Sequence, residues 1–243
     1  MNKAVLLETA RNAVSVIKNG GLALTPADIG YGLLGNSEYS IRKMYSLKGR
    51  SFTNPCIVAG NMNVLTEIAV VPDDGTLEWL LEITRDSTLA VVFPLNKESR
   101  LIRSLSPWVL EHSTESDSIA VFLNCGPVVE EMVRLASEEG MLLVGSSGNF
   151  SKSGNNFRLQ DVPSEIREGA DFTCDMGVSK YENPERMATT ILNFSNHSVR
   201  RLGVNGAEIL SSYQCFAAER KLPLLREEIA PVTDKNRETE APV

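Results

Sequence analysis

Two segments of the sequence carry side chains suited to binding a polyphosphate. Lys48 and Arg50 stand two positions apart, so an extended backbone would direct both side chains the same way. Lysine supplies a mobile point charge, and arginine supplies a planar fork that binds an anion through paired hydrogen bonds. Ser147 and Asn149 lie in a loop of small residues that we expect at the carboxyl end of a strand, where open α/β sheets bind ligands. These segments together predict an anion-binding site.

A third segment, residues 26–33, places an acid and a phenol, Asp28 and Tyr31, in a glycine-rich turn after a strand. We treat both as candidate substrate-binding residues. Each segment also has a structural interpretation, because paired cations at a helix end are commonly a solvated face and a Ser-Gly loop is commonly a turn. Asp28 could accept hydrogen bonds within its turn, and Tyr31 could pack in the core.

Composition excludes several classes of protein. A net charge of −7 argues against a general nucleic-acid-binding surface, which needs clustered cations. Four scattered cysteines without a Cys-x-x-Cys pair, together with only two histidines, predict no metal site. We expect reduced thiols in a cytoplasmic protein. Residues 1–20 predict an amphipathic helix rather than a signal sequence, and no stretch is long enough to span a bilayer.

Apolar strands that alternate with helices predict one α/β domain with a well-covered sheet. We expect strands at residues 22–25, 56–59, 89–93, 119–123, 141–144, 172–174 and 190–192, and around residue 199. Pro26 is expected to end the first strand in a loop. Between the strands, we expect a helix capped by Ser37 that runs into Lys48, further helices at residues 64–69 and 77–83, and one that opens at Pro127.

The order of the candidate segments resembles that of the YrdC-like family. In chain order the matching segments are residues 26–33, Lys48-x-Arg50 with Asn54-Pro55, Ser147-x-Asn149, Thr189-Thr190-Ile191 and Arg201-Leu202-Gly203. The resemblance extends over residues 13–209. It implies an α/β fold in which a twisted mixed β-sheet carries helices on both faces and forms a concave nucleotide-binding cleft.

The resemblance also implies an activity. Enzymes of this family use ATP, bicarbonate and L-threonine to make threonylcarbamoyl-adenylate, which serves the modification of tRNA, and they release pyrophosphate. By this analogy Lys48 and Arg50 would be the catalytic pair that holds the triphosphate and the carboxylate formed from bicarbonate. The residues that would contact the nucleotide and its phosphates are Ser147, Asn149, Thr190 and Arg201.

The expected ligands follow from the same analogy, and the sequence also indicates where the domain ends. We expect ATP and Mg²⁺, bicarbonate and a small amine or amino acid as ligands, with Mg²⁺ carried on the phosphates. We do not expect direct binding of tRNA, and the sequence leaves the oligomeric state open. The domain is expected to cover residues 1–216, followed by a charged and partly disordered extension at residues 217–243.

The sequence departs from the family pattern on the amino-acid side of the site. Ala27 and Ile29 replace two threonines of the usual turn, and Phe122 stands where many members carry an arginine. A site that has lost hydrogen-bonding groups should discriminate differently among substrates. Two alternatives therefore stay open: a paralogue that uses a different amine or carbamoyl acceptor, and a non-catalytic protein that binds nucleotide or RNA.

Overall fold

The structure is a computed structural model that describes residues 2–227. Its helices are α1 (Lys3–Lys18), α2 (Glu38–Lys48), α3 (Met62–Ile68), α4 (Asp74–Ile83), α5 (Arg100–Arg103), α6 (Pro107–Glu111), α7 (Pro127–Glu138), α8 (Ser164–Gly169) and α9 (Gly206–Arg220), with a short 3₁₀ turn at Leu159–Asp161. Its strands are β1 (Ala23–Ala27), β2 (Gly30–Gly35), β3 (Ile57–Ala59), β4 (Leu89–Pro94), β5 (Thr114–Glu115), β6 (Ser118–Leu123), β7 (Leu143–Ser147), β8 (Phe172–Thr173), β9 (Thr190–Asn193), β10 (Ser198–Arg201) and β11 (Arg226–Glu227).

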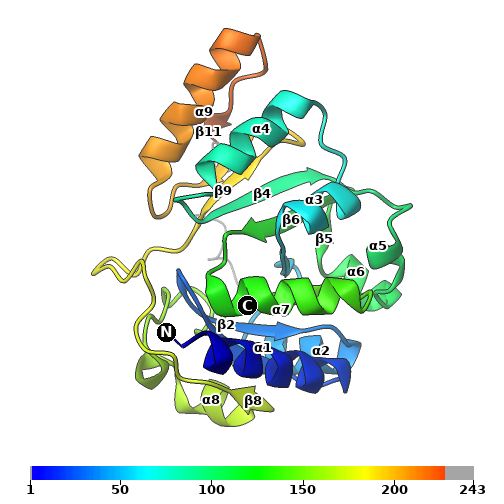
Figure 1. The fold of residues 1–243 in the computed structure, drawn as a ribbon, viewed down its shortest axis with the longest axis vertical. Coiled ribbons are helices and arrows are strands. Elements are labelled where there is room, and N and C mark those ends of the chain that lie inside the picture. Colours follow the sequence, from blue (N-terminus) through cyan, green and yellow to red (C-terminus); the bar gives the residue numbers. More distant parts are fainter. Residues whose placement is uncertain (1, 228–243) are drawn as a thin grey trace, which may run out of the picture.

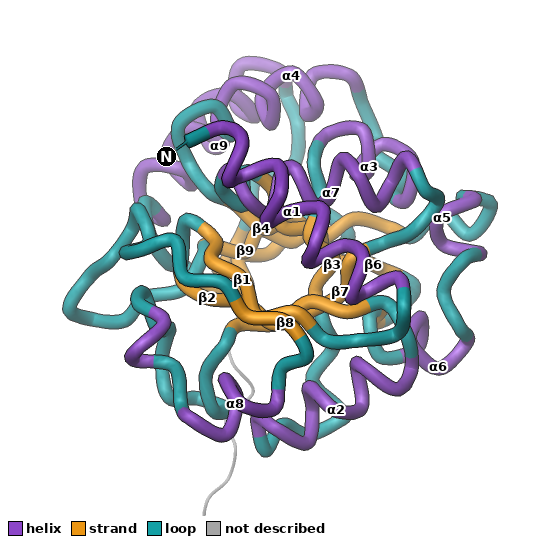
Figure 2. Tube along the Cα trace, turned by 60° about the horizontal axis from the view of Figure 1, so that its bottom comes forward, coloured by secondary structure: helices purple, strands orange, loops and turns teal. Residues whose placement is uncertain are grey.

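One mixed sheet joins all of these strands. Its order is β11-β10-β9-β4-β6-β3-β7-β2-β1-β8, and β5 pairs with β6. The sheet contains parallel neighbours, such as β3–β6 and β4–β9, and antiparallel ones, such as β4–β6 and β2–β7. In Figure 2 the strands cross the centre, with α1, α3 and α7 on one side and α2 and α8 on the other. The predicted α/β domain with a twisted mixed sheet between helices is confirmed.

The predicted break at Pro26 was wrong. β1 continues to Ala27 and forms a tight hairpin with β2, in which Pro26 faces Tyr31. Proline lacks an N–H and therefore cannot donate a hydrogen bond to a neighbouring strand. On the β8 side of β1, however, the paired residues are Ala23 and Leu24, so Pro26 has no partner strand there and no hydrogen bond is lost. The strand β2 escaped prediction because three of its six residues are glycine.

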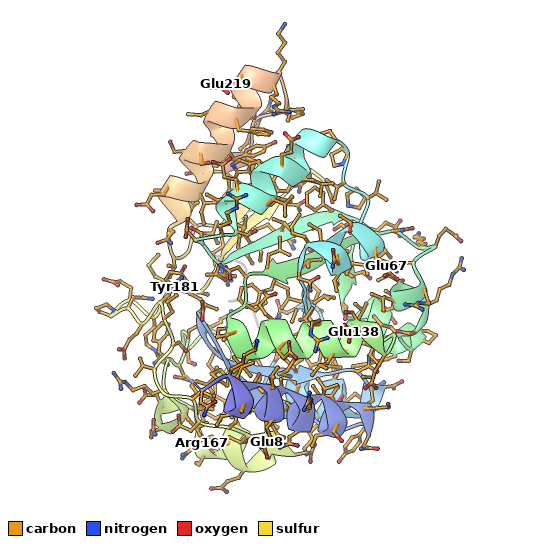
Figure 3. The ribbon with its side chains drawn as sticks, viewed as in Figure 1. Glu8, Glu67, Glu138, Arg167, Tyr181 and Glu219 are labelled. Carbon is orange, nitrogen blue, oxygen red and sulfur yellow. The ribbon has the colours of Figure 1, made fainter. Side chains whose placement is uncertain are left out.

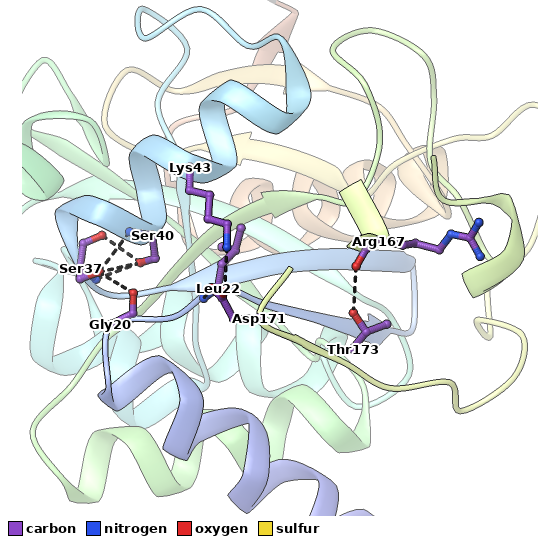
Figure 4. A network of polar contacts seen from close by, with 8 residues as sticks. All are labelled: Gly20, Leu22, Ser37, Ser40, Lys43, Arg167, Asp171 and Thr173. Carbon is purple, nitrogen blue, oxygen red and sulfur yellow. Dashed lines mark hydrogen bonds and ion pairs between the residues drawn. The ribbon is translucent and has the colours of Figure 1, made fainter. Parts of the chain in front are cut away.

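Helix α2 begins and ends as its sequence predicts. Ser37 accepts a hydrogen bond from the Ser40 N–H, and the Ser40 hydroxyl in turn bonds the Ser37 backbone. Gly49 ends the helix with a φ of 56°, a left-handed conformation that glycine adopts at little cost. Figure 4 shows that Lys43 of α2 also pairs with Asp171, whose carboxylate accepts the Leu22 N–H. These contacts fix α2, and with it Lys48, against the end of the sheet that β1 and β8 form.

The expected boundary between residues 216 and 217 lies within α9. This helix packs beside α4 (Figure 1), and Trp79 of α4 donates a hydrogen bond of 3.0 Å to Ser212 Oγ. Tyr213 and Ala217 are both buried. The helix extends past the expected boundary because buried residues of α9 lie on both sides of that boundary. Most of the expected extension, residues 228–243, lies outside the described residues.

Among residues 2–227, no helix combines the length and the apolar character needed to cross a membrane.

Candidate functional site

A cavity of about 240 Å³ lies over one face of the sheet. Its floor consists of small or apolar side chains on four neighbouring strands, namely Ala59, Val92, Ala120, Phe122 and Ile191. Its walls come from the β1–β2 hairpin, the end of β7, residues 50–57 and the end of β10. The sheet therefore gathers into one cavity segments that are as far apart in the chain as Thr25 and Arg201.

The charge of this cavity is opposite in sign to that of the whole chain. Three arginines line it, Arg50, Arg200 and Arg201, and none of the described lining residues is an aspartate or glutamate. Acidic side chains such as Glu8 on α1 and Glu138 on α7 are instead exposed on the outer surface (Figure 3). A cationic cavity in an acidic protein attracts anions to one place.

Two of the arginines lack an acidic partner within residues 2–227. Arg50 donates to the carbonyl oxygens of Asn54 and Pro55, the latter at 2.8 Å, and the Arg201 Nε donates to Thr189 O at 2.9 Å. Burial, and then the nearby charge of Arg50, lower the pKa of Arg201. Two cations held close together without an acid between them favour a bound anion.

Arg200 was not predicted as a site residue. Successive residues of a strand normally face opposite sides of a sheet, yet Arg200 and Arg201 both line the cavity. The pairing of β10 with β9 shifts register between Val199 and Arg201, and such a bulge re-aims side chains. Arg200 also pairs with Glu115 of β5, so part of its charge is neutralised. Its position directly before Arg201 was the signal available in the sequence.

Lys48 and Arg50 do not point the same way, contrary to the expectation from an extended backbone. Lys48 is the last residue of α2, and Gly49 then reverses the chain direction. The Lys48 side chain is only 2% exposed and does not line the cavity. Its amino group donates to Ser147 O and, at 2.6 Å, to Asn149 O. Lys48 thus supports the loop after β7 from behind, whereas Arg50 faces the cavity.

Burial changes the titration of Lys48. Desolvation, followed by the charge of Arg50, lowers the pKa of Lys48 to about 7. A neutral amine keeps two N–H groups, which are enough for the two carbonyl oxygens that it contacts. The support of the loop therefore does not depend on the charge of Lys48.

The end of β7 brings Ser147 to the cavity, whereas the loop that follows turns Asn149 away from it. Ser147 lines the cavity, whereas Asn149 is buried and its Nδ2 donates to Phe150 O at 2.6 Å. The Oδ1 of Asn149 has no hydrogen-bond partner among the described residues. Gly148 has no room for a side chain, because a Cβ there would lie 3.0 Å from Tyr31 O.

Asp28 and Tyr31 also separate in the structure. Tyr31 lines the cavity, and its hydroxyl lies 3.2 Å from both Asp175 Oδ1 and Gly177 O. Burial raises the pKa of Tyr31 to about 12. Asp28 does not line the cavity; its carboxylate packs against Gly126 before α7, and burial raises its pKa. The hairpin turn directs these two side chains to different places.

Thr190 does not line the cavity either. It is fully buried, and its hydroxyl donates to Val204 O at 3.2 Å and accepts the Gly203 N–H at 2.9 Å. The neighbouring Thr189 lines the cavity instead. Thr190 thus holds the Arg-x-Gly segment against β9, which in turn positions Arg201.

The residues that depart from the family pattern lie in the cavity itself. Ala27, Ile29 and Phe122 all line it. Within the described residues, no group of three or more His, Cys, Asp or Glu side chains could hold a metal ion. The cavity wall is therefore cationic in one part, where Arg50 and Arg201 lie, and apolar near the β1–β2 turn.

Comparisons with known proteins identify the family and the fold. A sequence profile of the Sua5/YciO/YrdC family, described as "Telomere recombination", matches residues 15–203. The fold is similar to that of P. abyssi Sua5 complexed with L-threonine, with a TM-score of 0.68 and 18% identity over 91% of this chain. This chain spans 59% of that Sua5 chain.

Two further structures share the fold. E. coli YciO matches with a TM-score of 0.61 and 15% identity, over 82% of this chain and 90% of that chain. HypF in its phosphate- and nucleotide-bound form matches with a TM-score of 0.58 and 16% identity, over 76% of this chain and 27% of that chain. At these identities the structures establish a common architecture.

Proposed function

Because this chain belongs to the Sua5/YciO/YrdC family, we propose that it is an adenylate-forming enzyme. The proposed substrates are ATP, bicarbonate and L-threonine, and the products are threonylcarbamoyl-adenylate, an intermediate in tRNA modification, and pyrophosphate. The observation that carries the proposal is the cavity in which Arg50 and Arg201 stand without an acidic partner among the described residues. The similarity to a Sua5 crystallised with L-threonine supports the choice of amine.

The proposed chemistry requires positioning and charge neutralisation. Threonine and bicarbonate would form a carbamate, with loss of water. A carbamate oxygen would then bond to the α-phosphorus of ATP, while the bond from that phosphorus to the β-phosphate oxygen breaks and pyrophosphate leaves. No protein nucleophile is needed. Arg50 and Arg201 would bind the developing charge, and Mg²⁺ on the phosphates would neutralise more of it.

Isotope labelling tests this function directly. The full-length protein, incubated with ATP, Mg²⁺, labelled bicarbonate and threonine, is expected to release pyrophosphate and to transfer label into an adenylate. Both signals should require the amine and the bicarbonate together. Calorimetry with ATP and Mg²⁺ supplies an independent measurement of nucleotide binding. Absence of ATP binding in the wild-type protein would overturn the proposal.

A second candidate function is the same reaction with a different amine. The observation that favours it is that Ala27, Ile29 and Phe122 line the cavity. A carbonyl or hydroxyl buried against apolar side chains loses its bonds to water without replacement, at a cost of about 1–3 kcal/mol. An amine with an aliphatic side chain avoids this cost. If this candidate is correct, pyrophosphate release measured with a panel of amino acids should be faster with valine-like than with threonine-like substrates.

The variant Ile29→Thr separates the two candidates. If the site has shifted toward another amine, restoring this hydroxyl is expected to raise threonine-dependent pyrophosphate release by about 10-fold, since one hydrogen bond contributes about 1 kcal/mol or more. Ile29→Val, which shortens the side chain without adding a hydroxyl, is the matched control. Robust threonine-dependent activity in the wild-type protein, unchanged in Ile29→Thr, would contradict the second candidate.

A further inference from the structure

Two adjacent buried asparagines connect two neighbouring walls of the cavity, just beyond the point where β2 and β7 stop pairing. The Asn155 Nδ2 donates to Ile29 O at 2.8 Å, in the turn between β1 and β2. The Asn156 Nδ2 donates to Gly148 O, also at 2.8 Å, in the loop after β7. Asn155 and Asn156 are 6% and 3% exposed, so these hydrogen bonds are shielded from water. One dipeptide therefore holds both the apolar wall and the loop that directly follows Ser147.

The backbone of this dipeptide adds to the connection. The Tyr31 N–H donates to Asn156 O at 2.8 Å, and the Gly148 N–H donates to Tyr31 O at 2.6 Å. Together with the side-chain amide of Asn156, these bonds form a closed chain between β2 and the loop. A shift of either wall would stretch hydrogen bonds on the other.

Arg186 completes the cluster from a third segment. Its Nε donates to Asn155 O at 2.9 Å, and its Nη2 donates to Asn156 Oδ1. The Asn155 N–H donates in return to Arg186 O at 3.1 Å. Arg186 lies just before Ala188 and Thr189, which line the cavity. We name Asn155, Asn156 and Arg186 the asparagine bridge.

The hairpin turn is shaped to admit the asparagine bridge. Gly30 has a φ of +128°, and a Cβ at this position would lie 2.9 Å from Asn156 O. A side chain there would both strain the backbone and displace the bridge. The close approach of the turn to Asn156 thus depends on glycine at position 30.

We propose that the asparagine bridge sets the distance between the amine-side turn and the nucleotide-side loop, and that Asn156 is a positioning residue for the reaction between the two substrates. The proposal rests on the proposed function, in which the amine lies near Ile29 and the phosphates near Ser147. Reaction between two bound substrates requires their reacting atoms to be about 3–3.5 Å apart. Asn156, which holds both walls but does not line the cavity, meets this requirement through the positions of other residues.

Asn156→Asp tests the proposal in the full-length protein. The aspartate keeps an acceptor for Arg186 but loses the donor to Gly148 O. Arg186→Gln is a second variant, since Arg186 is exposed and its loss endangers folding less. Asn63→Asp, the same chemical change at an exposed position on α3, is the matched control. Hydrogen exchange of residues 26–32 and 145–150, ATP affinity by calorimetry, and kcat and KM for threonine-dependent pyrophosphate release are measured for each protein.

The expected result has two parts. In both bridge variants, exchange in the two segments should rise together by about 10-fold, while exchange in α1 and α7 stays unchanged. The value of kcat should fall by about 10-fold or more, because the loss of one hydrogen bond of about 1.4 kcal/mol corresponds to a factor of ten. The Kd for ATP with Mg²⁺ and the KM for threonine should each change by less than about 3-fold. Arg186→Lys, which retains one donor group, should recover part of kcat.

Other results would overturn the proposal. Faster exchange in only one of the segments would show that the walls are not linked. Faster hydrogen exchange in both segments with an unchanged kcat would show that the link between the walls has no role in the reaction. If the wild-type protein neither binds ATP nor releases pyrophosphate with any amine, the proposed function fails separately, and exchange alone then decides whether the bridge links the walls.

Discussion

Alanine in place of Arg50 is expected to weaken the binding of ATP with Mg²⁺ by about 100-fold. Arg50 lines the cavity, and its contacts with Asn54 O and Pro55 O hold the guanidinium there. Hydrogen bonds to charged groups contribute about 1.5–3 kcal/mol, and 100-fold corresponds to about 2.8 kcal/mol. Arg50→Lys keeps the charge without the planar fork, so it should lose only about 10-fold. Calorimetry at fixed ionic strength measures all three proteins.

The control for Arg50 must remove an equal charge elsewhere. Arg103 lies on α5, pairs with Glu98 and is exposed, so Arg103→Ala changes the net charge identically without altering the cavity. Its affinity for ATP should match that of the wild-type protein. Equal losses in Arg50→Ala and Arg103→Ala would mean that overall charge, rather than the cavity, controls binding. An unchanged affinity in Arg50→Ala would remove Arg50 from the site.

Methionine in place of Lys48 is expected to lower both stability and nucleotide affinity. Methionine fills much of the same volume but cannot donate to Ser147 O and Asn149 O. Leaving buried carbonyl groups unpaired costs about 1–3 kcal/mol each, so a loss of about 3 kcal/mol in the free energy of unfolding is expected. The freed loop should also weaken ATP binding by about 30-fold or more. Denaturant unfolding and calorimetry provide the two measurements.

The stability difference between the wild-type protein and Lys48→Met should depend on pH. The pKa of Lys48 is about 7 in the folded chain, against an ordinary value of 10.5. Between these values the unfolded chain binds more protons, so wild-type stability rises with pH by at most about 1.4 kcal/mol per pH unit from this group. Methionine does not titrate. The destabilisation by Lys48→Met should therefore be larger at pH 9 than at pH 7.

Two outcomes would contradict this account of Lys48. A stability difference that stays constant or shrinks as pH rises from 7 to 9 would mean that the pKa of Lys48 is not lowered in the folded chain. Normal ATP affinity in a destabilised Lys48→Met protein would mean that the loop keeps its shape without this support. Lys48 would then contribute to folding alone.

The position of Lys48 also changes how the Lys-x-Arg motif is understood in this chain. The sequence presents Lys48 and Arg50 as a pair of equivalent anion-binding cations, but the structure gives them different tasks. Arg50 faces the cavity, and Lys48 supports the wall that carries Ser147. Lys48 is buried and does not line the cavity, so direct contact with a triphosphate there would require its side chain to move. The larger affinity loss is accordingly expected for Arg50→Ala, and the larger stability loss for Lys48→Met.

The sequence by itself determined the fold class, the family and most of the strands. Apolar runs such as residues 89–93 mark buried strands because only continuous burial tolerates them. The cap at Ser37 and the stop at Gly49 fix α2 through local hydrogen bonds and backbone freedom. These features depend on neighbours in the chain, so residue types alone reveal them. The ordered motifs then identified the family without any geometry.

Only the tertiary structure decided which of the predicted residues face the cavity. Arg50, Ser147, Tyr31 and Arg201 do, whereas Lys48, Asn149, Asp28 and Thr190 do not. The direction of each side chain depends on a left-handed Gly49, a bulge in β10 and a hairpin turn at Asp28. These features are local, but which of the side chains then faces the cavity depends on strands and loops brought together from distant parts of the chain. The asparagine bridge has the same origin, because its partners at Ile29 and Gly148 are far apart in the chain and meet only through the pairing of β1, β2 and β7.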